Sequence, residues 1–410
     1  MKRFIILSST IRNVGGAQLY AANKLAYYEK LGWIPDMYFF NPGPIKIEYL
    51  KRFEKNCLPD LAKPLRDTNR AIIDSVISKI LGDIRPDDEI LFECHMPHLA
   101  FWGELLAEKS RGKNTVYLLE EIIPKFTFKE AAFYEFKIKR KELLNTGEKG
   151  LKRIFKNYYQ PGKFGPYNYP LEPYCSNVVD YNSIKIPEDA QKADYSIISI
   201  GRLDKPYIKP MLDEILVFIK RHKDKCVNLI TVGGDLNDEM SNYIKGLFME
   251  EKNVKLFLLG YLVPIPYGWI KISDIAIASS NSILVSSDEG IPTIAIDIQD
   301  MMPLGIYKHT TNNLRLRDGD PIIPINVLLE DVLVRKRFCK QLVDHNEGDD
   351  LAKHLKPHLD LLNISDPTKK YFDVLGIYSP LEQVMHKFRR RVGALYHTVA
   401  DEFIIKKKND

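Results

Sequence analysis

Residues 196–203 read SIISIGRL, in which a short apolar run is followed by Gly201, the cation Arg202 and Leu203. A second run of this kind, VNLITVGGD, follows at residues 227–235. Apolar runs without strict alternation are typical of strands covered on both faces, as in parallel sheets. Helical spacing separates the two runs at Met211–Arg221, so this stretch predicts a β-α-β unit.

The same alternation of strands and helices extends in both directions from this unit. Further strands are predicted at Val254–Leu259, Asp274–Ala278 and Thr293–Ile296, and an earlier series at Phe4–Leu7, Met37–Phe40, Glu89–Glu93 and Thr115–Leu119. A helix is expected between Gly15-Gly16-Ala17-Gln18 and Gly32. The pattern predicts an α/β protein with two Rossmann-like domains, joined near residues 183–194.

Length and composition agree with this organisation. The chain has 410 residues, 45% of them hydrophobic and 28% charged, which suits two globular domains. The net charge of +5 is mild and the basic residues are mostly interleaved with acids, so no nucleic-acid partner is expected. The five cysteines form no CxxC pair, which favours a reducing cytosol. No apolar run is long enough to span a bilayer, so we expect a cytoplasmic protein.

Residues 128–158 combine helical spacing with basic and aromatic side chains. These are Lys137, Lys139, Arg140, Lys141, Lys152, Arg153 and Lys156, with Phe133, Tyr134, Phe136, Phe155, Tyr158 and Tyr159. One interpretation is that this segment binds the inner face of an anionic membrane, as a peripheral contact, or binds a phospholipid-linked acceptor. The other is a solvated helix face above an ordinary core stripe.

A long amphipathic helix is predicted at the C-terminus. Ser379 suits the N-cap, Pro380 the first helical position and Glu382 a capping box. The apolar positions that follow have helical spacing from Leu381 to Phe403. An apolar stripe of this length is expected to be buried, either against the rest of the chain or against a partner protein.

A series of short motifs, in order, resembles the retaining glycosyltransferases of family four. The motifs are Gly15-Gly16-Ala17-Gln18, Asn177-Val178-Val179-Asp180, Gly201-Arg202-Leu203 with Lys209, Val232-Gly233-Gly234-Asp235, Leu258-Leu259-Gly260-Tyr261, Ser273-Asp274-Ile275-Ala276-Ile277 and Gly290-Ile291-Pro292-Thr293. The resemblance covers nearly the whole chain. The paired glutamates that the family usually carries before its GxP turn are not evident, and extra residues separate Arg202 from Lys209.

The resemblance implies a GT-B fold, in which two Rossmann-like domains face a central cleft. The implied domains are an acceptor domain at residues 1–185, a nucleotide-sugar donor domain at 186–372, and a C-terminal helix at 373–410 that crosses back to the N-terminal domain. The implied activity is metal-independent, retaining transfer of a sugar from a UDP- or GDP-linked donor. The acceptor is a glycan or a lipid-linked glycan, in surface polysaccharide biosynthesis, and no further cofactor is implied.

Sugar transfer expels a diphosphate, whose growing negative charge has to be neutralised. Arg202 and Lys209 follow the end of a strand, where open α/β sheets bind ligands, and are the candidate clamps. We find no acidic pair in a suitable loop, which favours cations and helix N-termini over a metal. The alternative is that Arg202 pairs with a local acid and Lys209 is solvated.

The remaining candidates lie at other predicted strand ends. Gly15, Gly16 and Gly233 permit close approach of the backbone to a ligand, and Ser280, Asn281 and Ser282 suit the start of a short helix. Glu120, preferred over Glu121 by register, could stabilise the sugar cation or contact an acceptor hydroxyl. His95 and His98 could line the same cleft. Packing, capping or plain hydrogen bonding is the alternative for each.

Two other functions stay open from the sequence. A non-catalytic GT-B protein that binds glycan or assists another transferase is compatible with the missing glutamates. A nucleotide-sugar 2-epimerase would share the fold, but needs acids and histidines placed for proton abstraction, and the sequence does not reveal such a set.

Overall fold

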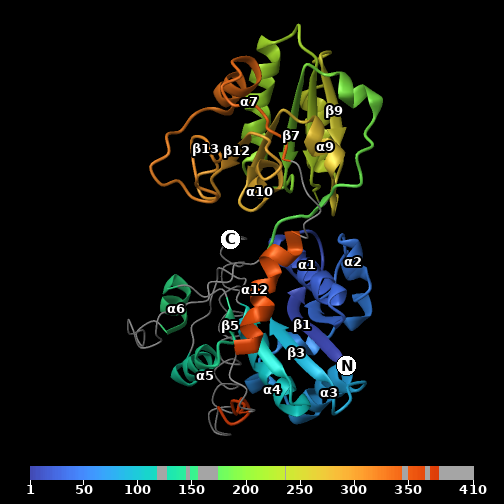
Figure 1. The fold of residues 1–410 in the computed structure, drawn as a ribbon, viewed down its shortest axis with the longest axis vertical. Helices are drawn as coiled ribbons and strands as arrows, with labels where there is room; N and C mark the ends of the chain where they lie inside the picture. Colours follow the sequence, from blue (N-terminus) through green and yellow to red (C-terminus); the bar gives the residue numbers. More distant parts are fainter. Residues whose placement is uncertain are drawn as a thin grey trace, which may run out of the picture. The chain divides into compact units, whose positions relative to one another are not determined.

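The computed structural model describes residues 1–117, 127–144, 148–155, 174–235, 237–343, 350–364 and 370–377 (Figure 1). The chain forms two compact units. Unit 1 consists of the described residues within Met1–Asn13 and Tyr20–Tyr174, together with those that follow Asp349. Unit 2 consists of Val14–Leu19 and the described part of Cys175–Gly348. These divisions differ from the predicted bounds at 185 and 372.

Unit 1 is built on a parallel sheet with strand order β2-β1-β3-β4-β5. The strands are β1 (Lys2–Thr10), β2 (Ile34–Asn41), β3 (Glu89–Cys94), β4 (Lys113–Tyr117) and β5 (Leu143–Leu144). The helices are α1 (Gly16–Lys30), which belongs to unit 1 beyond Leu19, α2 (Glu48–Lys51), α3 (Arg70–Leu81), α4 (Pro97–Ser110), α5 (Phe128–Lys139), α6 (Glu148–Phe155) and α12 (Asp350–Ile364). Four of the strands were predicted, and β5 is an addition that interrupts the helical pattern at residues 128–158.

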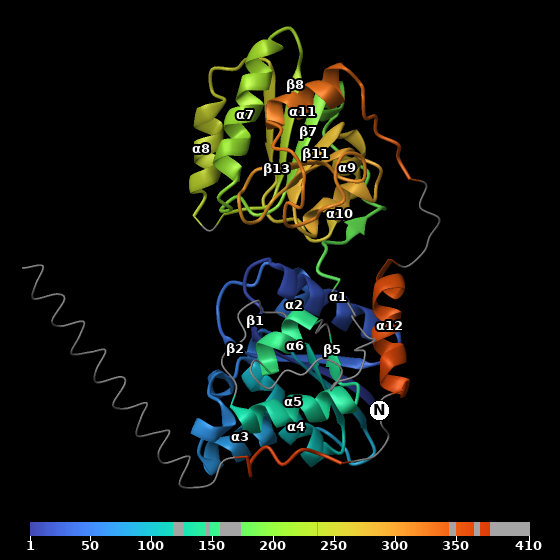
Figure 2. The ribbon, with the colours of Figure 1, turned by 90° about the vertical axis from the view of Figure 1, so that its left-hand side faces the viewer.

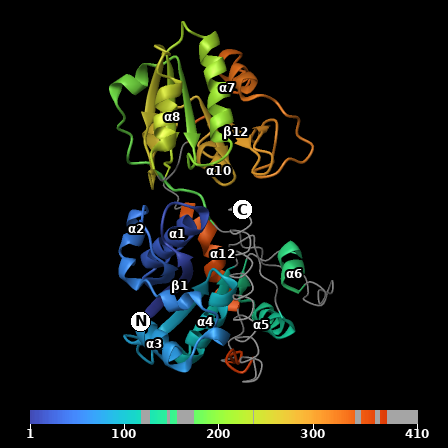
Figure 3. The same ribbon diagram turned by 180° about the vertical axis from the view of Figure 1, so that it is seen from behind.

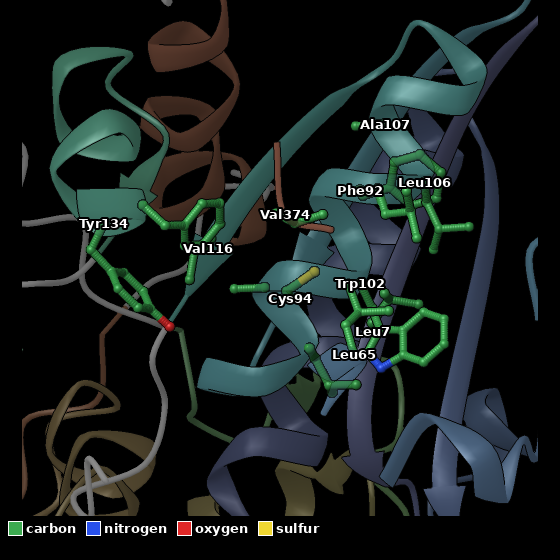
Figure 4. Packing of buried hydrophobic residues seen from close by; sticks show 14 of the residues in the cluster. Leu7, Leu65, Phe92, Cys94, Trp102, Leu106, Ala107, Val116, Tyr134 and Val374 are labelled. Carbon is green, nitrogen blue, oxygen red and sulfur yellow. The ribbon is translucent and has the colours of Figure 1, made fainter. Parts of the chain in front are cut away.

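The main core of unit 1 lies between the sheet and α3, α4 and α5. Alternate residues of β3 point into it, and Trp102 of α4 is fully buried there (Figure 4). Val374, from the end of the described chain, packs in the same core. Residues far apart in the sequence therefore complete one hydrophobic cluster, which burial of apolar surface stabilises.

The basic and aromatic segment is largely internal. Phe133 and Tyr134 of α5 are buried in this core. Lys137 is also buried and donates to Glu104 and Glu142, and Arg140 pairs with Glu142. Phe133 and Tyr134 therefore belong to a core stripe, as the second interpretation holds, whereas Lys137 and Arg140 form buried ion pairs that neither interpretation expected.

Unit 2 has a six-stranded sheet with order β13-β12-β11-β7-β8-β9, parallel except for β13. Its strands are β7 (Tyr195–Ile200), β8 (Val227–Val232), β9 (Val254–Leu258), β11 (Ile275–Ser279), β12 (Thr293–Ile296) and β13 (Pro303–Ile306), and a small pair joins β6 (Val179–Asp180) to β10 (Ile265–Pro266). All but β13 of the six-stranded sheet were predicted.

Helices cover both faces of this sheet. The helices are α7 (Ile208–Arg221), α8 (Glu239–Leu247), α9 (Tyr267–Ile272), α10 (Ser282–Ser287) and α11 (Ile325–Leu329). Figure 2 shows α7 and α8 on one side of the strands and α9 and α10 on the other. Residues of β7 alternate between the two cores, because successive side chains of a strand point to opposite faces.

The chain returns to unit 1 through α12, which lies beside α1 (Figure 3). The helix predicted from Ser379 lies outside the described residues. No helix among the described residues is both long and apolar enough to cross a bilayer.

Candidate functional site

Three loops of unit 2 are tied together where its parallel strands end. Gly201 N donates to Val232 O at 2.9 Å, and Gly233 N donates to Gly260 O at 2.7 Å. A Cβ on Gly233 would lie 1.9 Å from the carbonyl oxygen of Gly201, and its φ is +140°. Only glycine fits at this contact, so Gly233 fixes the spacing of the loops that follow β7 and β8.

Two cations lie on the loop after β7. Arg202 is 47% exposed and its Nε lies 3.3 Å from Asp204 Oδ1, so it does pair with a local acid. Lys205 donates from Nζ to Ser279 Oγ at 2.7 Å, which anchors it at the end of β11. Burial and the charge of Arg202 lower the pKa of Lys205. We call Arg202, Lys205 and Ser279 the β7–β11 edge.

Lys209 has a different setting from the one the resemblance implies. It lies in the first turn of α7, exposed, with Nζ 5.1 Å from the ring centroid of Tyr243. The lysine beside Arg202 is Lys205, which sequence reasoning missed. Its contact joins residues 74 positions apart, so spacing alone could not reveal it.

Helix α10 begins at Ser282, as predicted, next to this edge. Ser280 has a positive φ of +57° and its backbone N donates to Leu314 O at 3.1 Å. Asn281 makes no side-chain cap, and instead accepts at Oδ1 from Arg315 at 3.3 Å. The turn at Ser280 and Asn281 is thus held by the loop before α11, and Arg315 of this loop is a third cation near the edge.

The Gly15-Gly16 turn is closely packed. A Cβ on Gly16 would lie 3.3 Å from Cys175 Cβ, and one on Gly15 would lie 2.8 Å from Gln18 Oε1. Both contacts lie within unit 2. The contact with Cys175 accounts for Gly16 as a packing residue, whereas the Gln18 amide is the end of a flexible side chain that could move away from Gly15. Their use by a ligand stays a prediction.

The predicted residues of unit 1 fall into three cases. Glu120 and Glu121 lie outside the described residues. His98 is satisfied structurally, with Nε2 3.1 Å from Leu61 O, and burial lowers its pKa. His95 follows β3 and belongs to a buried group that the sequence did not suggest.

This group, the Lys24 cluster, joins two helices and a strand. It consists of Tyr20 and Lys24 of α1, Glu93 of β3, His95 directly after β3, and His358 of α12. Lys24 Nζ lies 2.9 Å from Tyr20 Oη and 3.1 Å from His358 Nδ1, and it also donates to Glu93. A lysine and a glutamate inside apolar patterns are the signal that could have indicated it.

Charge pairing dominates the chemistry of the cluster. Burial opposes ionisation of Glu93, but Lys24 and His95 outweigh burial and hold the pKa of this carboxyl at about 2. Glu93 Oε1 accepts from Tyr20 Oη at 3.0 Å and lies 3.1 Å from His95 Nε2. Among the described residues, no group of three or more His, Cys, Asp or Glu side chains is arranged to hold a metal ion.

No protein-family model and no curated protein matches this chain. A solved glycosyltransferase from Rickettsia africae matches with a TM-score of 0.52 and 15% identity, over 90% of this chain and 95% of that one. Anabaena HepE in complex with UDP and glucose gives 0.46 and 12%, over 94% and 99%. A UDP-GlcNAc 2-epimerase from Neisseria meningitidis bound to UDP-GlcNAc gives 0.46 and 13%, over 88% and 100%.

The structural match to the Rickettsia africae protein, at 15% identity, shows a shared fold. The chain has the two-unit α/β architecture of the GT-B class, with a Rossmann-like parallel sheet in each unit.

Proposed function

We propose that this protein transfers a sugar from a nucleotide-diphosphate-sugar to a glycan or lipid-linked acceptor. The observation that carries the proposal is the β7–β11 edge, where Arg202 and Lys205 lie together at the carboxyl end of a parallel sheet. The Rickettsia africae protein that shares this fold is described as a glycosyltransferase, which supports the proposal.

The two cations fit the leaving group of this reaction. A departing nucleoside diphosphate gains negative charge, which preplaced cations stabilise. Arg202 can offer two parallel N–H groups to a phosphate, and Lys205 a point charge. Asp204 compensates one positive charge, so a net positive charge remains for the ligand. Ser280, Asn281 and Ser282 lie beside Ser279, and Gly233 spaces the loops.

The finer parts of the proposal follow the family resemblance. Unit 2 would hold the UDP- or GDP-linked donor and unit 1 the acceptor, with retention of configuration and no metal. A role in surface polysaccharide synthesis, in the cytoplasm at the membrane, belongs to the same proposal. With Lys137 and Arg140 paired internally, membrane contact would rest on basic residues outside the core, including the C-terminal ones.

Calorimetry with UDP and GDP tests the site. We expect Arg202→Ala and Lys205→Ala each to weaken nucleotide binding by about 1.5–3 kcal/mol, the range for a hydrogen bond to a charged group. Lys209→Ala is the matched control and should change binding by less than about 0.5 kcal/mol. Binding that survives both Arg202→Ala and Lys205→Ala would remove the proposed donor site.

Donor turnover tests the reaction itself. Release of UDP or GDP from nucleotide-sugars should continue in excess EDTA. Activity that EDTA abolishes and manganese restores would contradict metal independence. Binding without any turnover would favour the non-catalytic alternative, and conversion of the donor to its 2-epimer would favour an epimerase.

A further inference from the structure

The loop that leads from β13 to α11 crosses the ends of two strands of unit 2. Just beyond β11, Ser280 N donates to Leu314 O at 3.1 Å. Just beyond β12, Ile298 N donates to Arg315 O at 2.9 Å. These two strands are parallel neighbours, and both contacts lie at their carboxyl ends. The backbone of Arg315 is therefore fixed at the edge where open α/β sheets bind ligands.

A second arginine of this loop, Arg317, anchors it to its surroundings. Its Nε donates to Asp300 Oδ2 at 3.0 Å, and its Nη2 donates to Pro303 O at 3.0 Å. Its Nη1 donates to the carbonyl oxygens of Asp320 at 3.0 Å and Pro321 at 3.3 Å. Every nitrogen of this guanidinium is thus engaged within unit 2, and the side chain ties the turn after β12 to the loop that carries Arg315.

The fold makes much less use of the guanidinium of Arg315. This side chain is exposed, and its Nη2 donates to Asn281 Oδ1 at 3.3 Å. Among the residues that the structure describes, no carboxylate forms an ion pair with Arg315. A guanidinium has five N–H donors in a planar fork. The anchored loop therefore presents a cation with most of its donors open.

Lys205 contacts the same turn as Arg315. Lys205 Nζ donates to Ser279 Oγ, two positions before Asn281. Strand β11 lies between β7 and β12, so Lys205 comes from one neighbour of β11 and Arg315 from the side of the other. Because Cα atoms two residues apart are separated by at most about 7 Å, the two cations flank one short turn.

The charges at this edge leave room for a third cation in donor binding. A nucleotide-sugar carries a negative charge on each of its two phosphates, and the departing nucleoside diphosphate gains more. Asp204 offsets the charge of Arg202, whose Nε lies 3.3 Å from Asp204 Oδ1. Lys205 then supplies one net positive charge. Arg315 supplies a second, which matches the second phosphate.

We propose that Arg315 is a third diphosphate-binding residue, which holds the phosphates of the donor together with Arg202 and Lys205 at the turn of residues 279–281. Arg317 is a positioning residue, because it fixes the loop that carries Arg315. This inference rests on the proposed function, since it completes the binding site of the nucleotide-sugar. It goes beyond the family resemblance, in which both candidate cations follow β7.

Calorimetry of the full-length protein with UDP tests the inference. Arg315→Gln removes the charge but keeps an amide N–H that can donate to Asn281. We expect it to bind UDP about tenfold more weakly, as for the loss of one hydrogen bond to a charged group. Lys308→Gln is the matched control, because Lys308 is exposed on the same loop and pairs with Asp288. It should stay within about twofold of wild type. Equal UDP affinities of wild type and Arg315→Gln would overturn the proposal.

UDP-glucose and UDP-glucuronate separate the phosphates from the sugar as the group that Arg315 binds. Arg315→Gln should weaken the binding of UDP, UDP-glucose and UDP-glucuronate by a similar factor, because the three share the diphosphate. A loss confined to UDP-glucuronate would contradict the proposal, since it would assign Arg315 to the carboxylate of the sugar.

A double-mutant cycle tests the positioning role of Arg317. Arg317→Lys keeps the charge but cannot reproduce the planar set of contacts. We expect it to weaken UDP binding several-fold in the wild-type background and to have little further effect in Arg315→Gln. Equal losses in both backgrounds would show that Arg317 does not act through Arg315.

Pyrophosphate separates this inference from the proposed function. A protein that binds UDP equally well with and without Arg315→Gln keeps its proposed function and loses this inference. Pyrophosphate binding that Arg315→Gln weakens, in a protein that binds neither UDP nor GDP, supports the anion site and contradicts the proposed function.

Discussion

A fully buried lysine, Lys137, forms a group of paired charges inside unit 1. Lys137 Nζ donates to Glu104 Oε2 and to Glu142 Oε2, each at 2.6 Å, and Arg140 Nη2 lies 3.0 Å from Glu142 Oε1. Two positive and two negative charges therefore balance inside unit 1. Such a group contributes little net stability over apolar packing, but the loss of one member leaves uncompensated buried charge.

We predict that Lys137→Met destabilises unit 1 by about 3–5 kcal/mol. The matched control is Lys139→Met on the same helix, because Lys139 is exposed and pairs with Glu135 at the surface. The control should change the free energy of unfolding by less than about 0.5 kcal/mol. Urea unfolding followed by tryptophan fluorescence measures both, and equal effects would show that the buried charges are not coupled.

Acid should reduce the difference between wild type and Lys137→Met. Burial raises the pKa of Glu104, but Lys137 outweighs burial and holds it below its usual value. A depressed carboxyl pKa stabilises the fold above the unfolded pKa, and this contribution is lost as pH falls through the folded pKa. Without Lys137 that contribution is absent, so the wild-type advantage should shrink below about pH 4.5.

At the scale of elements, the ends of β7 and β8 meet through glycine backbones. Gly233 lies against the carbonyl of Gly201, directly before Arg202. We predict that Gly233→Ala destabilises unit 2 by about 2 kcal/mol or more, because the obstacle is backbone and φ is positive. UDP binding should weaken as well.

Gly246 in α8 provides the control for Gly233→Ala. A Cβ there would meet nothing within 4 Å. Gly246→Ala should therefore stabilise the protein by up to about 0.5–1 kcal/mol, through helix propensity. Thermal unfolding of the two variants should shift in opposite directions, and a Gly233→Ala protein that is as stable as wild type would contradict the close approach.

The elements differ in how far the sequence predicts them. Strands β7, β8, β11 and β12 are short runs in which apolar residues predominate without strict alternation, which is why the sequence pattern located them. Strand β13 is short and contains Pro303 and Gly305, and β5 has only two residues, so neither has a periodicity to detect. The site shows the same limit, since Arg202 follows a recognisable strand while Lys205 is defined by its contact with Ser279 across the sheet.

At the scale of the whole molecule, unit 1 is completed by the end of the described chain. Leu355 and Leu361 of α12 are buried, and His358 joins the Lys24 cluster. Beyond α12, Tyr371 Oη donates to Gly112 O at 3.0 Å and Phe372 N donates to Glu104 Oε1 at 3.1 Å. Pro357 within α12 obscures its helical pattern, so the sequence placed the return to the N-terminal domain later, at residue 373.

Two truncations separate this described return from the predicted C-terminal helix. A chain ending at Asp373 loses Val374 and Ile377 from the unit 1 core, so it should be less stable than one ending at Ile377. Burial of the two side chains stabilises the core by at most about 3–6 kcal/mol, which corresponds to roughly 6–24 °C in the melting temperature of unit 1.

The chain ending at Ile377 tests the apolar stripe predicted from Leu381 to Phe403, in which we expect Phe388 and Leu395 to be buried. It should melt below the full-length protein, because removal of the stripe exposes the surface that covers it. Calorimetry of the three chains measures both steps. If the Ile377 chain melted like the full-length protein, the predicted helix would contribute nothing to stability. If the Asp373 and Ile377 chains melted together, Val374 and Ile377 would not support the core that they enter.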